Sequence, residues 1–380
     1  MKKTATIILA TLAFGWGQSF FNMRGLGGIV PPADARTTGL GSPCALSPLN
    51  PGIWVTLNQT SLAASGLAGI AVGTQSGSSR AVGTVRPASA AVAAPLPLQC
   101  RALLGIDDRF NQDFDVWSES LPDTAYRRHV YSHGGIHALR AGIAKSLLGR
   151  FCLGLDYSHL LGGSKEEWRF EGNSGAYSTT DTIETDYAGN TFQAGASFQT
   201  SRFSIAALYE PAMTLTAHRL KHVHGVVADS VRTYRIRLPN VMAFGGGVEP
   251  TDKLGLSLGL DLRPWAGATL DDVDAGYRNT WRISAGAEYQ LSPEYPLRIG
   301  YSRQTYYFDA LTSDPTGTAA ITEDGLYVGT SIPVPKFGSL DLSGSVLLRR
   351  ADDLTEVAGR LMLTLSYRET WARRTRRWGY

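Results

Sequence analysis

The chain has 380 residues, with 36 Lys and Arg against 33 Asp and Glu and a formal net charge of +3. This near balance excludes nucleic-acid binding by bulk charge. Three cysteines are too few for a disulfide-built scaffold and lack metal-ligand spacing, so we expect no metal and no cofactor. An oxidising compartment would allow one bridge, for which we favour Cys44–Cys100.

The N-terminus predicts a secretory signal peptide over residues 1–18. Two lysines precede an apolar run from Thr4 to about Trp16, and Gly15 and Gly17 form a small-x-small cleavage site. The alternative, a core helix of the mature domain, is less favoured. No other stretch approaches the roughly 18 consecutive apolar residues of a spanning helix, so a membrane location would require strands.

Residues 19–66 do not alternate and are rich in glycine, proline and small residues. From residue 67 onward the dominant period is two. In "RISAGAEYQL", for example, Ile283, Ala287 and Leu291 share one face. Strict alternation indicates strands with one apolar and one polar face. We predict fourteen strands, at roughly 67–76, 85–95, 99–110, 134–147, 150–160, 188–200, 202–217, 230–248, 252–265, 276–292, 295–308, 323–334, 337–350 and 354–368.

One of these strands contains a match to the serine-hydrolase pattern G-x-S-x-G, at residues 255–259. Ser257 has alternating leucines on both sides and no strand–turn–helix in which to form an elbow. We therefore predict that Ser257 faces the inside of a strand wall. Ser158 and His159 are neighbours in another strand and should point to opposite faces. We expect no catalytic residues and no enzyme activity.

Three features favour a membrane barrel over a soluble sandwich. Many predicted strands are about 10–14 residues long, whereas soluble strands usually have about 5–6. Aromatic residues cluster near strand ends, as in interfacial girdles. Short connections such as "QTSR" alternate with long polar ones, at 111–133, 161–187, 218–229, 266–275 and 309–322. The prediction is an all-β, antiparallel transmembrane β-barrel of about 14 strands over residues 67–371, in the bacterial outer membrane with short turns in the periplasm.

A barrel of this size has a lumen that must be filled or conduct water. The irregular segment 19–66 is the natural plug, because irregular backbone at membrane depth must be buried in protein. Pro95 and Pro97 indicate either a break in the wall ladder or a periplasmic turn.

Two features outside the strand pattern leave alternatives open. The basic segment "ARRTRRWGY" at 372–380 is either a disordered tail or a contact for a docking partner or anionic lipid. Clustered histidines, such as His218, His222 and His224 in one expected loop, are more typical of solvated loop residues than of a metal site.

The chain resembles the outer-membrane long-chain fatty-acid and hydrophobic-compound transporter family. The resemblance rests on Gly25-Leu26-Gly27-Gly28, on Asp34-Ala35, and on Asn58 and Leu62 of an Asn-Pro-Ala-x-Leu plug motif, in which Gln59 and Thr60 replace Pro and Ala. The passage from Leu238 to Leu254, with its "PTDKL", is the most specific match. The resemblance as a whole covers nearly all of the mature chain.

This resemblance implies passive uptake of hydrophobic, fatty-acid-like small molecules through an apolar lumen pocket and a lateral exit. It places Phe20, Phe21 and Met23 against the ligand, the alternative being plain plug packing. Asn58 and Asp34 would fix the plug, with Leu62 in the same motif, and Arg36 would form a lumen ion pair with Asp34.

Outer-membrane lipid is a further expected partner, whereas nucleic acid is not expected. We expect the barrel to be a monomer. A second function is left open: a related group with the same barrel acts as an attachment or shuttle partner in protein secretion. A periplasmic or secretion-machinery protein would then be a further partner.

Overall fold

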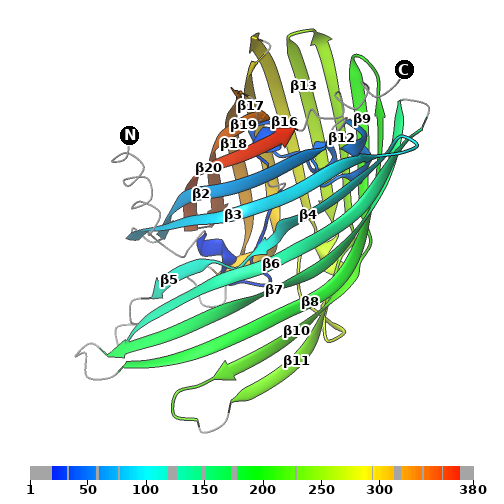
Figure 1. Ribbon diagram of the computed structural model, residues 1–380. Coiled ribbons are helices and arrows are strands. Elements are labelled where there is room, and N and C mark those ends of the chain that lie inside the picture. The colour runs from blue at the N-terminus through cyan, green and yellow to red at the C-terminus, as the bar shows by residue number, and fades with distance from the viewer. Residues whose placement is uncertain are drawn as a thin grey trace, which may run out of the picture.

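The computed structural model describes residues 19–31, 34–56, 60–75, 78–118, 126–147, 150–172, 178–226, 229–292, 294–311, 318–335, 338–352 and 354–368. Strands in these residues form a closed, antiparallel barrel of 14 strands, as predicted (Figure 1). Closure comes from β2, which pairs with the last strand, β20, over its whole length.

The wall strands follow one another around the barrel in chain order. Two of the fourteen are interrupted at prolines, between β9 and β10 at Pro211 and between β11 and β12 at Pro239, where no N–H is available for the ladder. The strands are β2 (Ser61–Gln75), β3 (Ser78–Leu96), β4 (Cys100–Asn111) with β5 (Phe114–Ser118), β6 (Tyr126–Leu147), β7 (Phe151–Gly172), β8 (Ser178–Gln199), β9 (Phe203–Glu210) with β10 (Met213–His222), β11 (Ser230–Leu238) with β12 (Val241–Thr251), β13 (Leu254–Arg263), β16 (Thr280–Ser292), β17 (Tyr295–Leu311), β18 (Thr318–Val334), β19 (Gly338–Ala351) and β20 (Leu354–Arg368).

Several sequence-based boundaries were wrong. The regions 111–133 and 161–187, expected to be long loops, are largely strand, because β6, β7 and β8 each run for 22 residues. Their outer parts carry polar residues on both faces, so the apolar alternation that marks a strand is lost there. The first wall strand begins at Ser61 rather than at 67, because its first residues are mostly small.

The outward face of the wall is apolar. On β13, Leu256, Leu258 and Leu260 are exposed, while Asp261 between them and the strand end is buried inside. Exposed aromatics such as Tyr289 and Trp281 lie at opposite ends of this belt on β16, separated by about 25 Å of strand at about 3.3 Å per residue. Such a belt with aromatic borders is typical of outer-membrane barrels.

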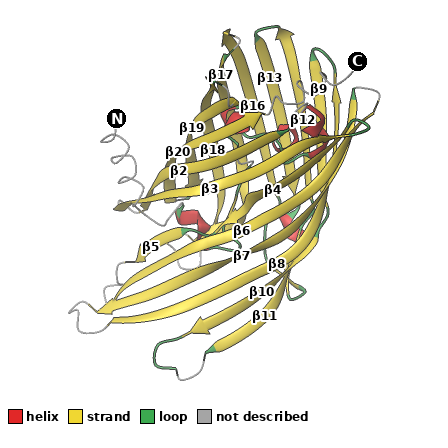
Figure 2. Cartoon of the chain, in the orientation of Figure 1, coloured by secondary structure: helices red, strands yellow, loops and turns green. Residues whose placement is uncertain are grey.

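The N-terminal segment lies inside the barrel (Figure 2). It consists of η2 (Phe20–Met23), β1 (Gly28–Ile29), α2 (Ala35–Gly39), η3 (Cys44–Leu46) and η4 (Pro51–Thr56). A second irregular piece, η5 (Trp265–Gly267) with β14 (Thr269–Leu270) and β15 (Val273–Asp274), connects β13 to β16. No helix in the described residues is long and apolar enough to cross a membrane.

Glycines on the inner face of the wall allow the plug backbone to approach closely. A Cβ on Gly300 would overlap the backbone nitrogen of Gly41, and a Cβ on Gly195 would overlap the amide oxygen of Asn50. Other wall glycines with such neighbours are Gly154 against Pro51, Gly245 against Leu46, Gly259 against Pro43 and Gly286 against Leu40. These positions set the seat of the plug.

The expected disulfide is absent: Cys44 and Cys100 both have free thiols. Cys44 is buried in the plug, whereas Cys100 begins β4 at the turn after β3. The spacing of the three cysteines along the sequence did not reveal that Cys44 and Cys100 lie in different parts of the fold. The prediction of a Cys44–Cys100 bridge is therefore wrong.

Candidate functional site

The wall ladder is interrupted between β3 and the strand formed by β4 and β5. Pairing of β3 with β4 runs from Leu96↔Cys100 only as far as Ser89↔Asp107. Beyond that point residues 78–87 of β3 pair with β2 alone, and β5 pairs with β6 alone. Figure 1 shows β5 diverging from β3. We call this region the wall break.

A proline in β3 could have revealed the wall break. Pro87 has no N–H to donate and lies where β3 loses its β4 partner, as expected of a residue confined to strand edges. Pro95 instead pairs with Arg101 at the end of the ladder, and Pro97 begins a turn. Of the two alternatives for Pro95 and Pro97, the structure thus shows a turn rather than a break in the wall ladder.

The plug covers the edge that β3 leaves. Gly28 and Ile29 of β1 pair with Asn111 and Phe110 at the end of β4. Val30 continues this contact by donating its N–H to the carbonyl of Arg109 at 3.0 Å. The inner side of the wall break is therefore closed by three residues of the plug.

A cavity of about 50 Å³ lies next to the wall break. It is lined by plug residues and by a run of neighbouring wall strands, β17 to β20, β2, β3 and β4. Its apolar lining includes Leu67, Ala88, Leu347 and Met362, and its polar lining includes Arg86, Asn111, Glu323, Arg349 and Arg360. The lining is thus amphipathic.

Buried charges beside this cavity hold the start of the plug. Glu356 accepts hydrogen bonds from Ser19 Oγ at 2.9 Å and from the Phe20 backbone N–H at 2.6 Å. Arg349 pairs with both Glu356 and Glu323, the latter at 2.5 Å. Anchored charges inside the barrel therefore determine where η2 lies.

Arg360 differs from its neighbour Arg349 because it forms no direct ion pair with a described carboxylate. Within the described part of the chain no carboxylate lies within ion-pair distance of Arg360, and its Nε is buried without a hydrogen bond. A lumen guanidinium in this state is a ready partner for an anionic group.

A larger cluster of apolar side chains packs around Phe21 of η2. Phe21 is 3% exposed and lies 6.3 Å, ring to ring, from Tyr306. Trp265 of η5 stacks on Tyr307 at 4.1 Å, which in turn accepts a hydrogen bond from the Leu26 N–H at 2.8 Å. Wall, plug and the β13–β16 connection thus share one apolar core.

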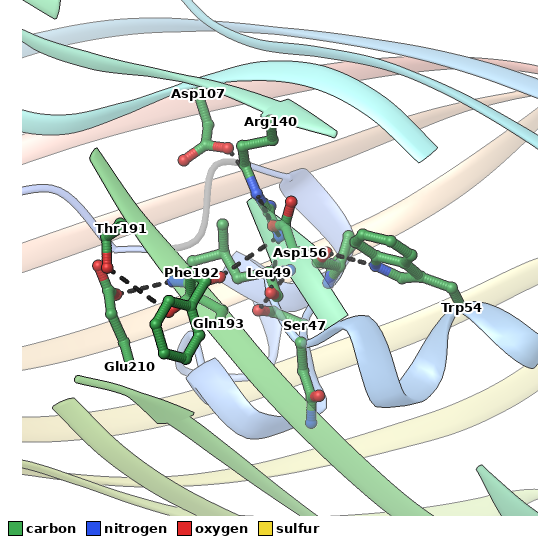
Figure 3. Close-up of polar contacts among 12 residues, drawn as sticks. Ser47, Leu49, Trp54, Asp107, Arg140, Asp156, Thr191, Phe192, Gln193 and Glu210 are labelled. Carbon is green, nitrogen blue, oxygen red and sulfur yellow. Dashed lines mark hydrogen bonds and ion pairs between the residues drawn. The ribbon is translucent and has the colours of Figure 1, made fainter. Parts of the chain in front are cut away.

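The middle of the plug is held by a second set of buried charges (Figure 3). Arg140 donates to Asp156 at 2.6 Å and to the carbonyl of Leu49 at 2.8 Å, and it lies 3.3 Å from Asp107. Its guanidinium also lies 5.8 Å from the ring of Trp54. A third arginine, Arg282, donates to the carbonyl of Gly41 at 3.0 Å. Sequence reasoning missed these arginines because inward-facing charges look like any polar face of a strand.

The predicted ligand-contacting residues lie in η2, at the edge of the cavity. Phe20 packs against Gly73 and the cluster of Ala71 and Tyr327, Phe21 is buried in the larger apolar core, and Met23 is 37% exposed. From this helix, Asn22 is the residue that lines the cavity. Contact of the apolar side chains of η2 with a ligand stays a prediction.

The predicted plug residues have different positions. Asp34 caps α2 by accepting from the Thr37 N–H at 2.8 Å, and desolvation raises the pKa of this carboxyl above its ordinary value. Arg36 lies 3.7 Å from Glu288 rather than pairing with Asp34 as expected. Leu62 belongs to β2 and not to the plug, and its side chain is exposed. Asn58 lies outside the described residues, as do residues 1–18 and 372–380.

At the end of the short turns, the plug lines a second, open cavity of about 400 Å³. Its lining includes Arg36, Trp54, Arg202 and Glu288. Ser257 also lines it, from the middle of β13, so the residue is an inward-facing strand position as predicted. Among the described residues, no three His, Cys, Asp or Glu side chains come together in a way that could hold a metal ion.

No family model and no curated protein sequence matches the chain. Its fold is similar to that of a Pseudomonas aeruginosa FadL homologue, with 14% identity and a TM-score of 0.65 over 90% of this chain and 99% of that one. It is also similar to the P. putida toluene transporter TodX (13%, 0.61, 89% and 99%) and to the CymD monoaromatic hydrocarbon channel (11%, 0.58, 89% and 98%). The predicted resemblance and the outer-membrane location are confirmed at the level of the fold.

Proposed function

We propose that this outer-membrane barrel takes up hydrophobic small molecules and releases them sideways into the membrane through the wall break. The observation that carries the proposal is the position of the lumen cavity directly beside an interruption of the wall ladder. The three solved structures that share the fold are a FadL homologue, a toluene transporter and a monoaromatic hydrocarbon channel, which supports this class of cargo.

The driving force is burial of apolar surface. A hydrophobic solute gains about 25 cal/mol for each Å² removed from water, so an apolar lumen concentrates it without chemistry. Lateral release then spares the solute a second exposure to water in the periplasm. The plug, seated on wall glycines and three arginines, blocks the straight aqueous route.

Passage requires movement of the plug. A cavity of about 50 Å³ holds water, whereas one of about 150 Å³ is needed for benzene. The adjacent elements that can yield are η2 and β1, which are held by side-chain contacts and by a two-residue ladder. In our proposal Phe20, Phe21 and Met23 contact the ligand once η2 has moved.

The amphipathic lining favours a fatty-acid-like ligand within this class. Arg360 provides the only lumen guanidinium of the cavity that, within the described residues, has neither a carboxylate nor a carbonyl partner. Leu347, Met362 and Ala88 provide apolar surface beside it. A carboxylate would bind Arg360, and the alkyl chain would cover the apolar side.

The test compares the uptake of radiolabelled oleate and toluene by bacteria that lack their own hydrophobic-uptake barrel. Arg360→Gln should raise the KM for oleate roughly tenfold, the equivalent of losing one charged hydrogen bond, and leave toluene uptake unchanged. Arg350→Gln is the matched control, because Arg350 is the exposed neighbour of Arg349 on β19.

Equal loss of both cargoes in Arg360→Gln would contradict a carboxylate site but not hydrophobic uptake. Failure of the wild-type chain to take up either compound, despite insertion, would contradict the proposed function itself. The attachment or shuttle role in protein secretion would then become the leading alternative, tested by co-purification of a stable protein partner.

A further inference from the structure

Three polar side chains cross the wall break in a row. Arg86 of β3 lies 2.9 Å from Asp108 of β4, and Asp108 lies 2.6 Å from Nδ1 of His137 on β6. Arg86 lines the lumen cavity, whereas His137 shares the outward face of β6 with the exposed Leu139. The row therefore runs from the cavity to the outer surface through the place where the ladder is missing.

The backbone around Asp108 is arranged for this role. Asp108 pairs in register with His137 on β6, and the register between these strands shifts only after Asp108, in a bulge before Phe110. Asp107, one residue earlier, is the last β4 residue paired with β3. Arg86 is thus the first charged residue of β3 beyond the ladder, and Asp108 is its counterpart on β4.

The contact between Arg86 and Asp108 is a charge contact rather than a well-formed hydrogen bond. Their side chains are 14% and 6% exposed, so water screens them little. Even so, Arg86 Nε and Asp108 Oδ2 are both buried without a hydrogen-bond partner in the described structure. Such a pair holds the two edges together but gives up few directed bonds when they separate.

Burying these charges in a wall has no evident packing purpose. Ionisable groups at membrane depth are costly and usually mark a route or a switch. A continuous β3–β4 ladder would close the wall with backbone hydrogen bonds alone, as the full-length ladder between β2 and β20 does. Arg80 of β3 also reaches across, with its guanidinium 5.2 Å from the ring of Trp117 on β5.

We propose that the Arg86–Asp108 ion pair, backed by His137, is the gate of the lateral exit. With the pair formed, the wall break is closed between the cavity and the surrounding lipid. When the pair separates, Arg86 swings into the cavity, and an apolar solute passes between β3 and β4. The proposal rests on the lateral route of the proposed function, yet the gate itself can be measured without any transported cargo.

The experiment measures access from the bilayer to the cavity. A reporter cysteine is introduced by Ala88→Cys, because Ala88 lines the cavity and is 3% exposed. The native thiols are removed by Cys44→Ala, Cys100→Ala and Cys152→Ala. The full barrel in lipid vesicles is then treated with a lipid-soluble pyrene maleimide or with a membrane-impermeant sulfonated maleimide, and the labelling rates are recorded.

With the gate pair intact, lipid-soluble reagent should label the reporter slowly. Arg86→Met and Asp108→Asn should each raise this rate at least tenfold while leaving the rate with the impermeant reagent within twofold. The charge exchange Arg86→Asp with Asp108→Arg should bring the rate back toward that of the intact pair. Arg303→Met is the control, because Arg303 and Asp324 are register partners in the intact β17–β18 ladder.

Equal labelling in the intact, Arg86→Met and Asp108→Asn proteins would overturn the gate. A matching rise with the impermeant reagent would also overturn it, because that result shows general loosening of the barrel. Wild-type uptake of oleate or toluene is scored separately. Uptake with gate-independent labelling contradicts only the gate, and gate-dependent labelling without uptake contradicts only the proposed function.

Discussion

Arg140 holds two buried carboxylates and the plug backbone at once, with a side chain that is 4% exposed. Removing a partner from a buried charge network usually costs about 3–5 kcal/mol, because the remaining charge is left uncompensated. We predict that Arg140→Met lowers the free energy of unfolding by about this amount. Heat-dependent gel mobility of the inserted barrel would show a lower transition temperature.

The matched control neutralises the two buried carboxylates that lose their partner in Arg140→Met. Combining it with Asp107→Asn and Asp156→Asn removes both buried charges and should recover most of the lost stability. If Arg140→Met alone leaves the transition unchanged, the plug is not held by this network.

Gly300 tests the seat of the plug. A single methyl group there would overlap backbone atoms of Gly41, which cannot yield as the end of a side chain can. Gly300→Ala should therefore displace the plug locally, at a cost of about 1–3 kcal/mol. The expected result is faster permeation of a hydrophilic β-lactam into intact cells.

Gly344→Ala provides the comparison on the neighbouring part of the wall. Its new Cβ would meet only Val328 Cγ1, at an ordinary 3.7 Å. Permeation should stay at the wild-type level. Equal permeation in the two variants would contradict the close fit of plug and wall.

The three longest strands, β6, β7 and β8, extend beyond the apolar belt. On β7, Leu153 is exposed within the belt, whereas Glu184 on β8 is exposed near the far end of that strand. We predict that an impermeant maleimide labels Glu184→Cys on intact cells and does not label Leu153→Cys, which lipid covers. Labelling of both positions would place the belt outside the membrane.

Strands were predictable wherever one face meets lipid. The alternation of β13, β16 and β20 gave their positions to within a few residues, because lipid demands apolar side chains at every second position. The outer halves of β6 to β8 have water on the outside, so apolar side chains are not required at every second position there. Their backbone ladder therefore cannot be recognised from an alternation of apolar and polar residues.

The candidate site was predictable only in outline. The plug segment and its start at η2 followed from the irregular composition and the resemblance. The wall residues that hold the plug could not be predicted. Arg140, Arg282 and Arg349 lie on strands far apart in sequence, and each contacts the plug only when the barrel has closed around it. The Arg86–Asp108 contact joins the consecutive strands β3 and β4, and the sequence signal for it was Pro87 at the edge of β3.

As a whole, the molecule separates three environments. Apolar side chains face lipid, charged networks hold the plug inside the lumen, and the ladder between β3 and β4 stops at Ser89 and Asp107. In the proposed function, the plug closes the aqueous path and the wall break is the lateral exit. It suits a cargo that prefers lipid to water.

The most direct measurement is uptake of radiolabelled oleate by a bacterium without its own hydrophobic-uptake barrel, after the insertion of this chain has been verified by heat-dependent mobility. The account predicts uptake above the empty-vector control that is lost when residues 19–24, the anchored start of the plug, are deleted. An inserted barrel that takes up neither oleate nor toluene would contradict it.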